Sequence, residues 1–500
     1  MLLKIRHGIL EITNHPNTRK SAIIINDEII LSSGTILAPY IRPVEPNGQC
    51  ASSKIIETLR NDSLVNVQED NNDSKFLNSL NYQITFDRKG LVNQSQIFTR
   101  YSAKLLYLFS CNEVSRYIQH ICSTGGQIDD TSKECFLSSF VVLSFRKTND
   151  KEILERFISQ IKNYLRFLYK AQKLDDILTI CTPFGLEEFY KTIHIGKISN
   201  LINSNGSLFV LSNNLPIGCE GAAVFNDKLR LIGMIICTSF QRQNENVNLT
   251  LAASFSHILI DFMKKLGISV SSIAVPPKIS SFQWERSIVV VMIDDKQCTG
   301  TLVKILNKTF VLTCSHVIED DNSTITCRSA YGNFEANLIW KNPNFHKPFD
   351  VALLKPSSNI PNKYFVKLSP NRPHPGQMVY NAGFPFFIKF DNKHDFNPSI
   401  FQGRIIKYTP GAIMSDGCVQ AGQSGGPMFD ENGCIVGICV SNLKEDNVIY
   451  PNCNTAVPIN DIRQTLEQYA RTGDLTVLNN LVTKDSMVLN SDPMQIQSKL

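Results

Sequence analysis

Three short stretches in the second half of the chain decide the fold. Residues 310–316 read Phe-Val-Leu-Thr-Cys-Ser-His, residues 349–354 read Phe-Asp-Val-Ala-Leu-Leu, and residues 422–427 read Gly-Gln-Ser-Gly-Gly-Pro. The first two are apolar, β-branched runs that predict short buried strands. His316 follows one strand and Asp350 stands at the mouth of the other, whereas Ser424 lies in a tight turn between glycines.

These residue types, in the order His, Asp, Ser, are those of nucleophilic catalysis. A serine hydroxyl is a poor nucleophile at neutral pH and needs an adjacent base. Imidazole can take that proton and return it to the leaving amine, and a carboxylate holds the imidazole tautomer. Taken singly, each residue could be structural. Because the three occur together, we predict a catalytic triad of His316, Asp350 and Ser424, with the N–H groups of Gly422 and Ser424 as an oxyanion hole.

The three stretches resemble the histidine, aspartate and serine motifs of the chymotrypsin-like serine proteases. The resemblance covers about residues 285 to 470. It implies an all-β fold in which two six-stranded antiparallel barrels hold the triad between them. Gln423 departs from the motif, since secreted members usually carry an aspartate there that pairs with a freed N-terminus. Activation by insertion of a new N-terminus is therefore not expected.

The first half of the chain carries a weaker copy of the same pattern. Residues 218–225 match residues 422–429 at an offset of 204 residues. The further matches pair residues 231–233 with 435–437, 252–255 with 456–459, 196–198 with 403–405, and 34–37 with 300–303. The sequence thus predicts two tandem double-barrel domains. Glu220 stands at the serine position and no histidine motif follows Gly34, so we predict that the first copy is degenerate. It would serve as a scaffold, a docking surface or an oligomerisation unit.

The predicted division of the chain has four parts. These are a degenerate protease-like domain at residues 1–267, a Ser- and Pro-rich linker at 268–285, an active trypsin-like domain at 286–474, and a tail at 475–500. We expect two insertions in the first copy. Residues 45–80 are polar and predict a mobile loop, and residues 150–170 have apolar residues at helical spacing, with Asn149 or Asp150 as N-cap.

The residue six before the nucleophile usually floors the primary specificity pocket of this fold, and here it is Cys418. Without an acid in the pocket, a preference for Lys or Arg is not expected, because nothing would pair the charge. We predict a small apolar pocket, also lined by Val440 and Ser441. A cysteine side chain could fit such a pocket.

The last three residues, Ser498, Lys499 and Leu500, form a tripeptide that an import receptor reads as a peroxisomal address. A degenerate copy, an active copy and this tripeptide together resemble the peroxisomal, in plants glyoxysomal, proteases that process leader peptides. That resemblance implies a matrix enzyme that removes N-terminal leaders from imported precursors, many of them in β-oxidation, and that cleaves itself and self-associates. It also implies cleavage beside cysteine, so Cys111 is a candidate self-cleavage site. Two alternatives remain: a non-enzymatic peptide-docking or chaperone protein, and a general quality-control protease.

The composition argues against several other classes. The net charge of 50 − 45 = +5 over 500 residues is too dilute to indicate nucleic acid or an anionic membrane as partner. The longest strand-like apolar run, residues 288–293, is far shorter than the roughly 18 residues of a membrane span. Charges near the start leave no signal-peptide core. The 14 cysteines are scattered without a CxxC pair, so we predict reduced thiols, no metal site and no other cofactor.

Overall fold

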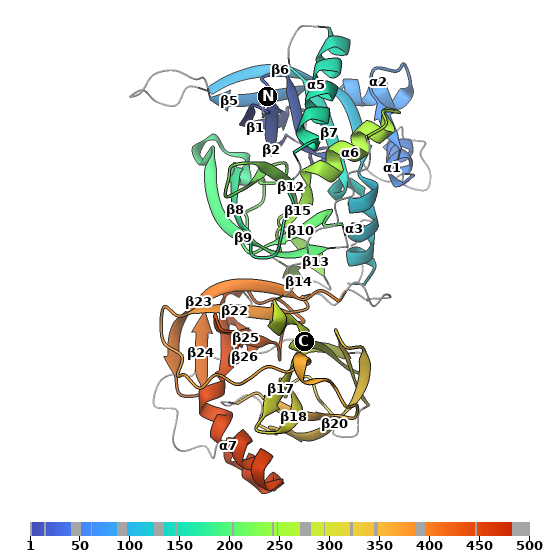
Figure 1. Cartoon of the computed structure of the whole chain (residues 1–500). Helices are drawn as coiled ribbons and strands as arrows, with labels where there is room; N and C mark the ends of the chain where they lie inside the picture. The colour runs from blue at the N-terminus through green and yellow to red at the C-terminus, as the bar shows by residue number, and fades with distance from the viewer. Residues whose placement is uncertain are drawn as a thin grey trace. The chain divides into compact units, whose positions relative to one another are not determined.

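The computed structural model divides the chain into two compact units, residues 1–278 and 279–500 (Figure 1). The residues that it describes are 3–14, 17–41, 52–61, 63–87, 98–124, 135–145, 149–167, 169–202, 205–242, 245–247, 249–270, 282–294, 296–320, 324–344, 349–385, 396–445 and 448–482. The division falls inside the segment predicted as the linker. The tripeptide Ser498 to Leu500 lies outside the described residues.

The first barrel of the second unit is closed from six antiparallel strands. These are β16 (Ile288–Ile293), β17 (Lys296–Ile305), β18 (Lys308–Thr313), β19 (Ile325–Ser329), β20 (Asn333–Lys341) and β21 (Ala352–Pro356), in the order β16-β17-β18-β21-β20-β19. Alternate residues of β16, Val289, Val291 and Ile293, belong to the buried core, together with Leu302 and Val311 of the next two strands. The period of two is that of a strand with one face in a barrel.

The second barrel of this unit has the same construction. Its strands are β22 (Met378–Gly383), β23 (Ser399–Thr409), β24 (Ala412–Ser415), β25 (Pro427–Phe429), β26 (Ile435–Glu445) and β27 (Val448–Pro458), in the order β22-β23-β24-β27-β26-β25. Helix α7 (Ile459–Thr472) continues directly from β27 and ends at Gly473, whose φ is 76°. Short 3-10 helices are η4 (Gln283–Ser287), η5 (Asn362–Tyr364) and η7 (Leu475–Leu481).

The first sheet of the first unit repeats this topology with one added strand. Its strands are β1 (Ile5–Ile12), β2 (Thr18–Ile25), β3 (Ile29–Ser33), β4 (Leu64–Asn66), β5 (Tyr82–Asp87), β6 (Phe98–Ser110) and β7 (Ser139–Ser144). The order β4-β6-β5-β1-β2-β3-β7, with a further β6–β7 pairing, closes six strands into a ring and leaves β4 on the outside of β6. The ring β1-β2-β3-β7-β6-β5 matches β16-β17-β18-β21-β20-β19 strand for strand.

The remaining strands of the first unit form a second closed barrel. They are β8 (Asp176–Cys181), β9 (Thr192–Ile202), β10 (Leu208–Leu211), β11 (Ala223–Asn226), β12 (Leu231–Cys237) and β15 (Leu251–Ser254), and their order β10-β15-β12-β11-β8-β9 is that of the second barrel of the other unit. A hairpin, β13 (Phe240–Arg242) with β14 (Glu245–Val247), and helix α6 (Phe255–Lys265) complete it. The predicted all-β fold of two tandem double barrels is confirmed.

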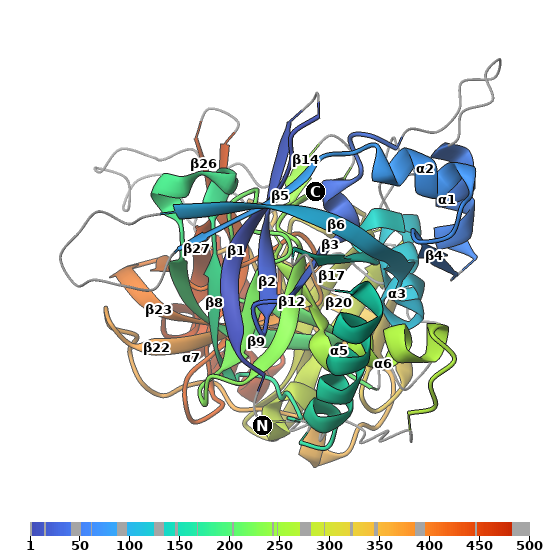
Figure 2. The ribbon, with the colours of Figure 1, turned by 90° about the horizontal axis from the view of Figure 1, so that it is seen from above.

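The two predicted insertions have different outcomes. The helix is confirmed as α5 (Asp150–Leu165), with the Asn149 side chain accepting from the N–H of Lys151. It packs beside α6 (Figure 2), where the rings of Phe157 and Phe262 have centroids 6.2 Å apart. A further helix, α3 (Asn112–Thr124), follows β6 directly.

The mobile loop predicted at residues 45–80 is wrong for the part that the structure describes. Helix α1 (Ser52–Arg60), strand β4 and helix α2 (Asn72–Asn78) occupy it. Although the segment is mostly polar, its few apolar residues Ile55, Leu59 and Leu77 are fully buried and hold the helices in place. The side chain of Asn71 caps α2 by accepting from the N–H of Ser74.

Candidate active site

The barrel register brings His316 and Asp350 together. Thr313, the last residue of β18, pairs with Ala352 of β21, so the residues that follow the one and precede the other are neighbours. His316 Nδ1 lies 2.5 Å from Asp350 Oδ2. The backbone N–H groups of Ser315 and His316 donate to Asp350 Oδ1 at 2.6 and 3.0 Å. With three donors on a buried carboxylate, the imidazole carries its proton on Nδ1 and presents Nε2 as an acceptor.

Glycine at position 425 brings Ser424 close to this pair. Gly425 has a φ of 80°, and a Cβ there would overlap the carbonyl oxygen of Thr299 and lie 2.7 Å from the backbone nitrogen of Cys314. The N–H of Thr299 also donates to the Ser424 carbonyl at 3.0 Å. The loop of residues 422–426 therefore crosses directly over the end of β18, two residues before His316.

The Ser424 hydroxyl is engaged elsewhere in this structure. Its Oγ donates to the carbonyl of Val440 at 3.0 Å, and His316 Nε2 lies 3.8 Å from Cys314 Sγ. Within the described part of the chain no hydrogen bond joins Ser424 to His316. Proton transfer to His316 therefore requires the Ser424 hydroxyl to rotate away from the Val440 carbonyl. Catalytic hydrogen bonds often form fully only when substrate is bound.

The two predicted oxyanion donors are the free amides of this loop. The N–H groups of Gln423, Gly425 and Gly426 donate to backbone carbonyls, whereas those of Gly422 and Ser424 have no acceptor among the described residues. Gly422 has a φ of 93°, which only glycine adopts readily. Both amides are thus available to a developing oxyanion.

Gln423 has a local structural use. It is buried, and its Oε1 accepts from the N–H of Gln420 at 2.7 Å, which closes the turn before the serine. The side chain therefore stabilises the loop through a contact within the same turn.

The predicted pocket residues lie on the segments around Ser424. Cys418 is buried, and its Sγ lies 3.1 Å from Gln420 Nε2. Val440 contributes the carbonyl that accepts from Ser424. Ser441 Oγ lies 3.0 Å from Thr455 Oγ1. The sequence did not predict the contact between Ser441 and Thr455, because only the register of β26 with β27 reveals it.

The corresponding positions of the first unit can be read from shared contacts. The Ser32 hydroxyl donates to Ser21 O at 2.7 Å, as Thr313 Oγ1 donates to Thr299 O at 2.8 Å. Counting from these pairs, Thr35 stands where His316 does. Gly34 thus follows β3, the third strand of its barrel, whereas Gly300 lies within β17, the second strand of its barrel. The predicted match of residues 34–37 with 300–303 is therefore wrong.

The other two triad positions of the first unit are also replaced. Ser32 pairs with Val141 as Thr313 pairs with Ala352, which places Ser139 at the position of Asp350. The offset of 204 residues places Glu220 at that of Ser424, and Gly221, with a φ of 87°, repeats the turn of Gly425.

Glu220 fills the site of the first unit with its own carboxylate. Its Oε2 accepts from Lys20 Nζ at 2.7 Å and from the N–H of Gly218 at 3.1 Å, and its Oε1 accepts from Thr238 Oγ1 at 3.1 Å. Gly218 corresponds to Gly422, so an amide equivalent to an oxyanion donor is already occupied.

The remaining predicted site residue, Cys111, is fully buried between β6 and α3. Its N–H donates to Ser138 O and its carbonyl accepts from Ser115 N, both at 2.8 Å, and burial raises the pKa of its thiol to about 12. Cleavage beside Cys111 would require local opening of the first unit. The described residues contain no group of three His, Cys, Asp or Glu side chains placed to hold a metal ion. None of their helices is long and apolar enough to cross a membrane.

Comparison with known families agrees with this geometry. Residues 298–438 match the model of the trypsin-like peptidase domain, which is the class of protein that the double barrel and the His316–Asp350 pair define. This part of the chain is therefore similar to trypsin-like peptidase domains.

The chain is also similar to two curated proteins named peroxisomal leader peptide-processing protease. The human protein is 26% identical over 337 residues, which are 61% of this chain and 57% of the relative. The mouse protein is 25% identical over 338 residues, with the same coverage. The chain thus spans little more than half the length of these relatives. Among solved structures, the serine endoprotease from Yersinia pestis aligns with a TM-score of 0.32 and 20% identity, over 39% of this chain and 69% of that one.

Proposed function

We propose that the chain is a serine endopeptidase in which His316, Asp350 and Ser424 form the catalytic triad. The observation that carries the proposal is the buried carboxylate of Asp350, which accepts from His316 Nδ1 and from two backbone amides. Such a carboxylate orients an imidazole and stabilises the imidazolium that forms during acyl transfer. The N–H groups of Gly422 and Ser424, which have no acceptor among the described residues, add the second element that acyl transfer needs, a site for the oxyanion.

The mechanism follows from these positions. His316 Nε2 takes the proton of the Ser424 hydroxyl as Oγ attacks the scissile carbonyl, and Asp350 stabilises the imidazolium. The N–H groups of Gly422 and Ser424 donate to the oxyanion of the tetrahedral intermediate. His316 then protonates the leaving amine, and the acyl group remains on Ser424. A water molecule activated by His316 releases it.

The proposed substrates are precursors imported into the peroxisomal matrix, including enzymes of β-oxidation. Two observations support this choice: the names of the human and mouse relatives, and the Ser498-Lys499-Leu500 tripeptide that an import receptor would bind. Removal of N-terminal leaders requires a single cut in an extended segment. The pocket formed by Cys418, Val440 and Ser441 would accept a small uncharged residue at that cut, and self-processing would use the same preference.

The predicted domain at residues 1–267 is proposed to be non-catalytic. The predicted domain at residues 286–474 is proposed to carry the activity. Thr35 stands where the imidazole base would be, and Glu220 stands where the serine nucleophile would be, with its carboxylate already engaged by Lys20, Gly218 and Thr238. The Glu220 carboxylate also accepts from the amide that would otherwise bind an oxyanion. This unit then serves as scaffold, docking surface or self-association unit.

The test incubates the purified full chain with a leader-bearing matrix precursor and measures product masses. The wild type should make one discrete cut and be labelled by a fluorophosphonate, whereas Ser424→Ala should do neither. Ser358→Ala, which removes an exposed serine of the same unit, is the control and should behave as wild type. Many cuts would indicate a quality-control protease. Labelling of Ser424 without a cut would refute the leader substrate. The absence of both labelling and cutting would favour the non-enzymatic docking protein.

A further inference from the structure

Strand β6 has a free edge over the first half of its length. Residues 98–103 pair with β5, from Phe98 opposite Asp87 to Ala103 opposite Tyr82. On the other edge of β6, pairing with β7 begins only at Lys104. This residue lies opposite Ser144, the last residue of β7. β4 pairs only with residues 107–109. Among the described strands, none covers the second edge of residues 98–103.

This edge presents backbone groups to solvent. In an antiparallel pair, alternate residues direct their N–H and C=O groups away from the partner strand. Arg100, Tyr101 and Ser102 on this part of the strand are exposed residues. An unpaired edge of this kind is a template for another extended chain.

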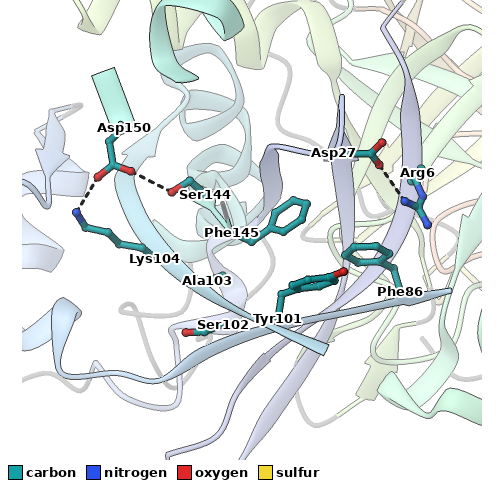
Figure 3. Close-up of a pocket in the computed structure, with 10 residues that line it drawn as sticks. All are labelled: Arg6, Asp27, Phe86, Tyr101, Ser102, Ala103, Lys104, Ser144, Phe145 and Asp150. Carbon is teal, nitrogen blue, oxygen red and sulfur yellow. Dashed lines mark hydrogen bonds and ion pairs between the residues drawn. The ribbon is translucent and has the colours of Figure 1, made fainter. Parts of the chain in front are cut away.

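A cavity of about 690 Å³ lies against the same part of the strand (Figure 3). Tyr101, Ser102 and Ala103 line it from β6, and Phe86 and Phe145 add two further aromatic rings. The centroids of Phe86 and Tyr101 are 5.3 Å apart, those of Phe86 and Phe145 5.6 Å, and those of Tyr101 and Phe145 5.7 Å. Tyr101 remains 43% exposed, so one ring of this aromatic cluster is open to a ligand.

The charged residues around the cavity are already paired with one another. Arg6 lies 2.9 Å from Asp27, and Lys104 lies 2.8 Å from Asp150, which also accepts from the Ser144 hydroxyl (Figure 3). These pairs leave the cavity lining without an excess charge of either sign. The charge pattern therefore favours an uncharged group against the three rings.

We propose that the aromatic cavity and the free edge of β6 form a docking site for an extended segment of a protein substrate. The segment adds as a strand to residues 98–103, where β7 has ended, and places an aromatic or large aliphatic side chain against Phe86, Tyr101 and Phe145. Only a polypeptide uses both features, since a small apolar molecule would leave the edge amides unpaired. The identity of the occupant as a substrate segment rests on the proposed function. The site gives the non-catalytic unit a role in substrate capture.

Binding can be measured without cleavage on the full chain carrying Ser424→Ala. The probe is the fluorescein-labelled peptide Gly-Ser-Thr-Val-Thr-Phe-Thr-Val-Ser-Gly, followed by fluorescence anisotropy. We expect the added change Tyr101→Ala to weaken binding about tenfold, the effect of losing one aromatic contact. The control Tyr331→Ala removes a tyrosine of equal exposure, 44%, from the second unit and should change nothing. The same peptide with Ala for Phe should also bind about tenfold more weakly.

The strand-addition step has its own readout that needs no change to the protein. A probe N-methylated at each of its central residues, from Thr to Thr around Phe, has no N–H group to donate from either edge, so we expect it to lose binding. Hydrogen exchange should show slower exchange of amides in residues 98–103 when the unmodified probe is bound.

Each other outcome is decisive. Protection of residues 440–442 alone would place the peptide beside Ser424 and overturn the docking site while leaving the proposed function intact. Equal binding by Tyr101→Ala and its parent would also overturn the docking site. Tyr101-dependent binding by a chain whose Ser424 resists fluorophosphonate would keep the docking site and refute the protease.

Discussion

Replacing Gly425 with alanine tests the close approach that positions the nucleophile. The added Cβ would overlap the Thr299 carbonyl oxygen and lie 2.7 Å from Cys314 N, at a φ of 80°. The positive φ costs a non-glycine residue about 1–2 kcal/mol, and overpacking adds about 1–3 kcal/mol. We expect Gly425→Ala to lower the free energy of unfolding of the second unit by about 2–5 kcal/mol. Activity should fall at least about 100-fold, because the shift displaces Ser424 and its amide.

Gly473→Ala separates the two contributions. Gly473 has nearly the same φ, 76°, but no atom lies within 4 Å of its would-be Cβ. It should therefore cost only about 1–2 kcal/mol, with activity unchanged.

Tryptophan fluorescence during urea unfolding reports on the right unit. The chain has 2 tryptophans, and both, Trp284 and Trp340, lie in the second unit, where the ring of Trp284 is 4.4 Å from that of Phe429. Equal midpoints for Gly425→Ala and Gly473→Ala would refute the close approach.

Three further predictions concern the triad, the first unit and the pocket. Asp350→Asn should lower kcat on a peptide substrate by about 10⁴-fold with the fold retained; a loss under about tenfold would contradict the assigned role. Burial lowers the pKa of His7 from 6.5 to about 3, so the unfolded chain binds the extra proton and the stability of the first unit should fall as pH drops from 6.5 toward 3, by at most about 1.4 kcal/mol per pH unit. Hydrogen exchange of peptides from the first unit should show that His7→Gln reduces the dependence of this unit's free energy of unfolding on pH. An unchanged pH dependence would contradict the role of His7. Cys418→Asp should shift cleavage in a peptide library toward Lys and Arg, and an unaltered profile would remove Cys418 from the pocket floor.

The sequence predicted the second unit well because its motifs are local. Residues 310–316 and 349–354 each contain a strand and the polar residue at its end. Once β18 pairs with β21, the contact between His316 and Asp350 follows from the register. What local sequence could not show is the rotamer of Ser424, because its acceptor, the Val440 carbonyl, depends on packing sixteen residues away.

The misplaced match at Gly34 has a physical cause. A tetrapeptide of glycine, threonine and two aliphatic residues occurs both in a strand interior, as at Gly300, and at the start of a helical turn, as at Gly34. Only long-range contacts distinguish the two settings, here those of Ser32 with Ser21 and of Thr313 with Thr299. The loop predicted at 45–80 failed for a related reason, since a few buried apolar residues suffice for short helices packed on a sheet.

The two units show that the scaffold of this site is separable from its chemistry. Gly218 and Gly221 have φ values of 94° and 87°, and Gly422 and Gly425 have 93° and 80°. The N–H of Gly221 donates to Ile235 O at 2.7 Å, as that of Gly425 donates to Cys439 O. The backbone that would present a nucleophile is therefore present in both units, and the difference lies in three side chains at equivalent positions. Because the Glu220 carboxylate accepts from the N–H of Gly218, the retained backbone of the first unit has no free donor at that position for an oxyanion. A peptide-binding role for this unit would then use another surface, and the edge of β6 at residues 98–103, which no described strand covers, is the one proposed above.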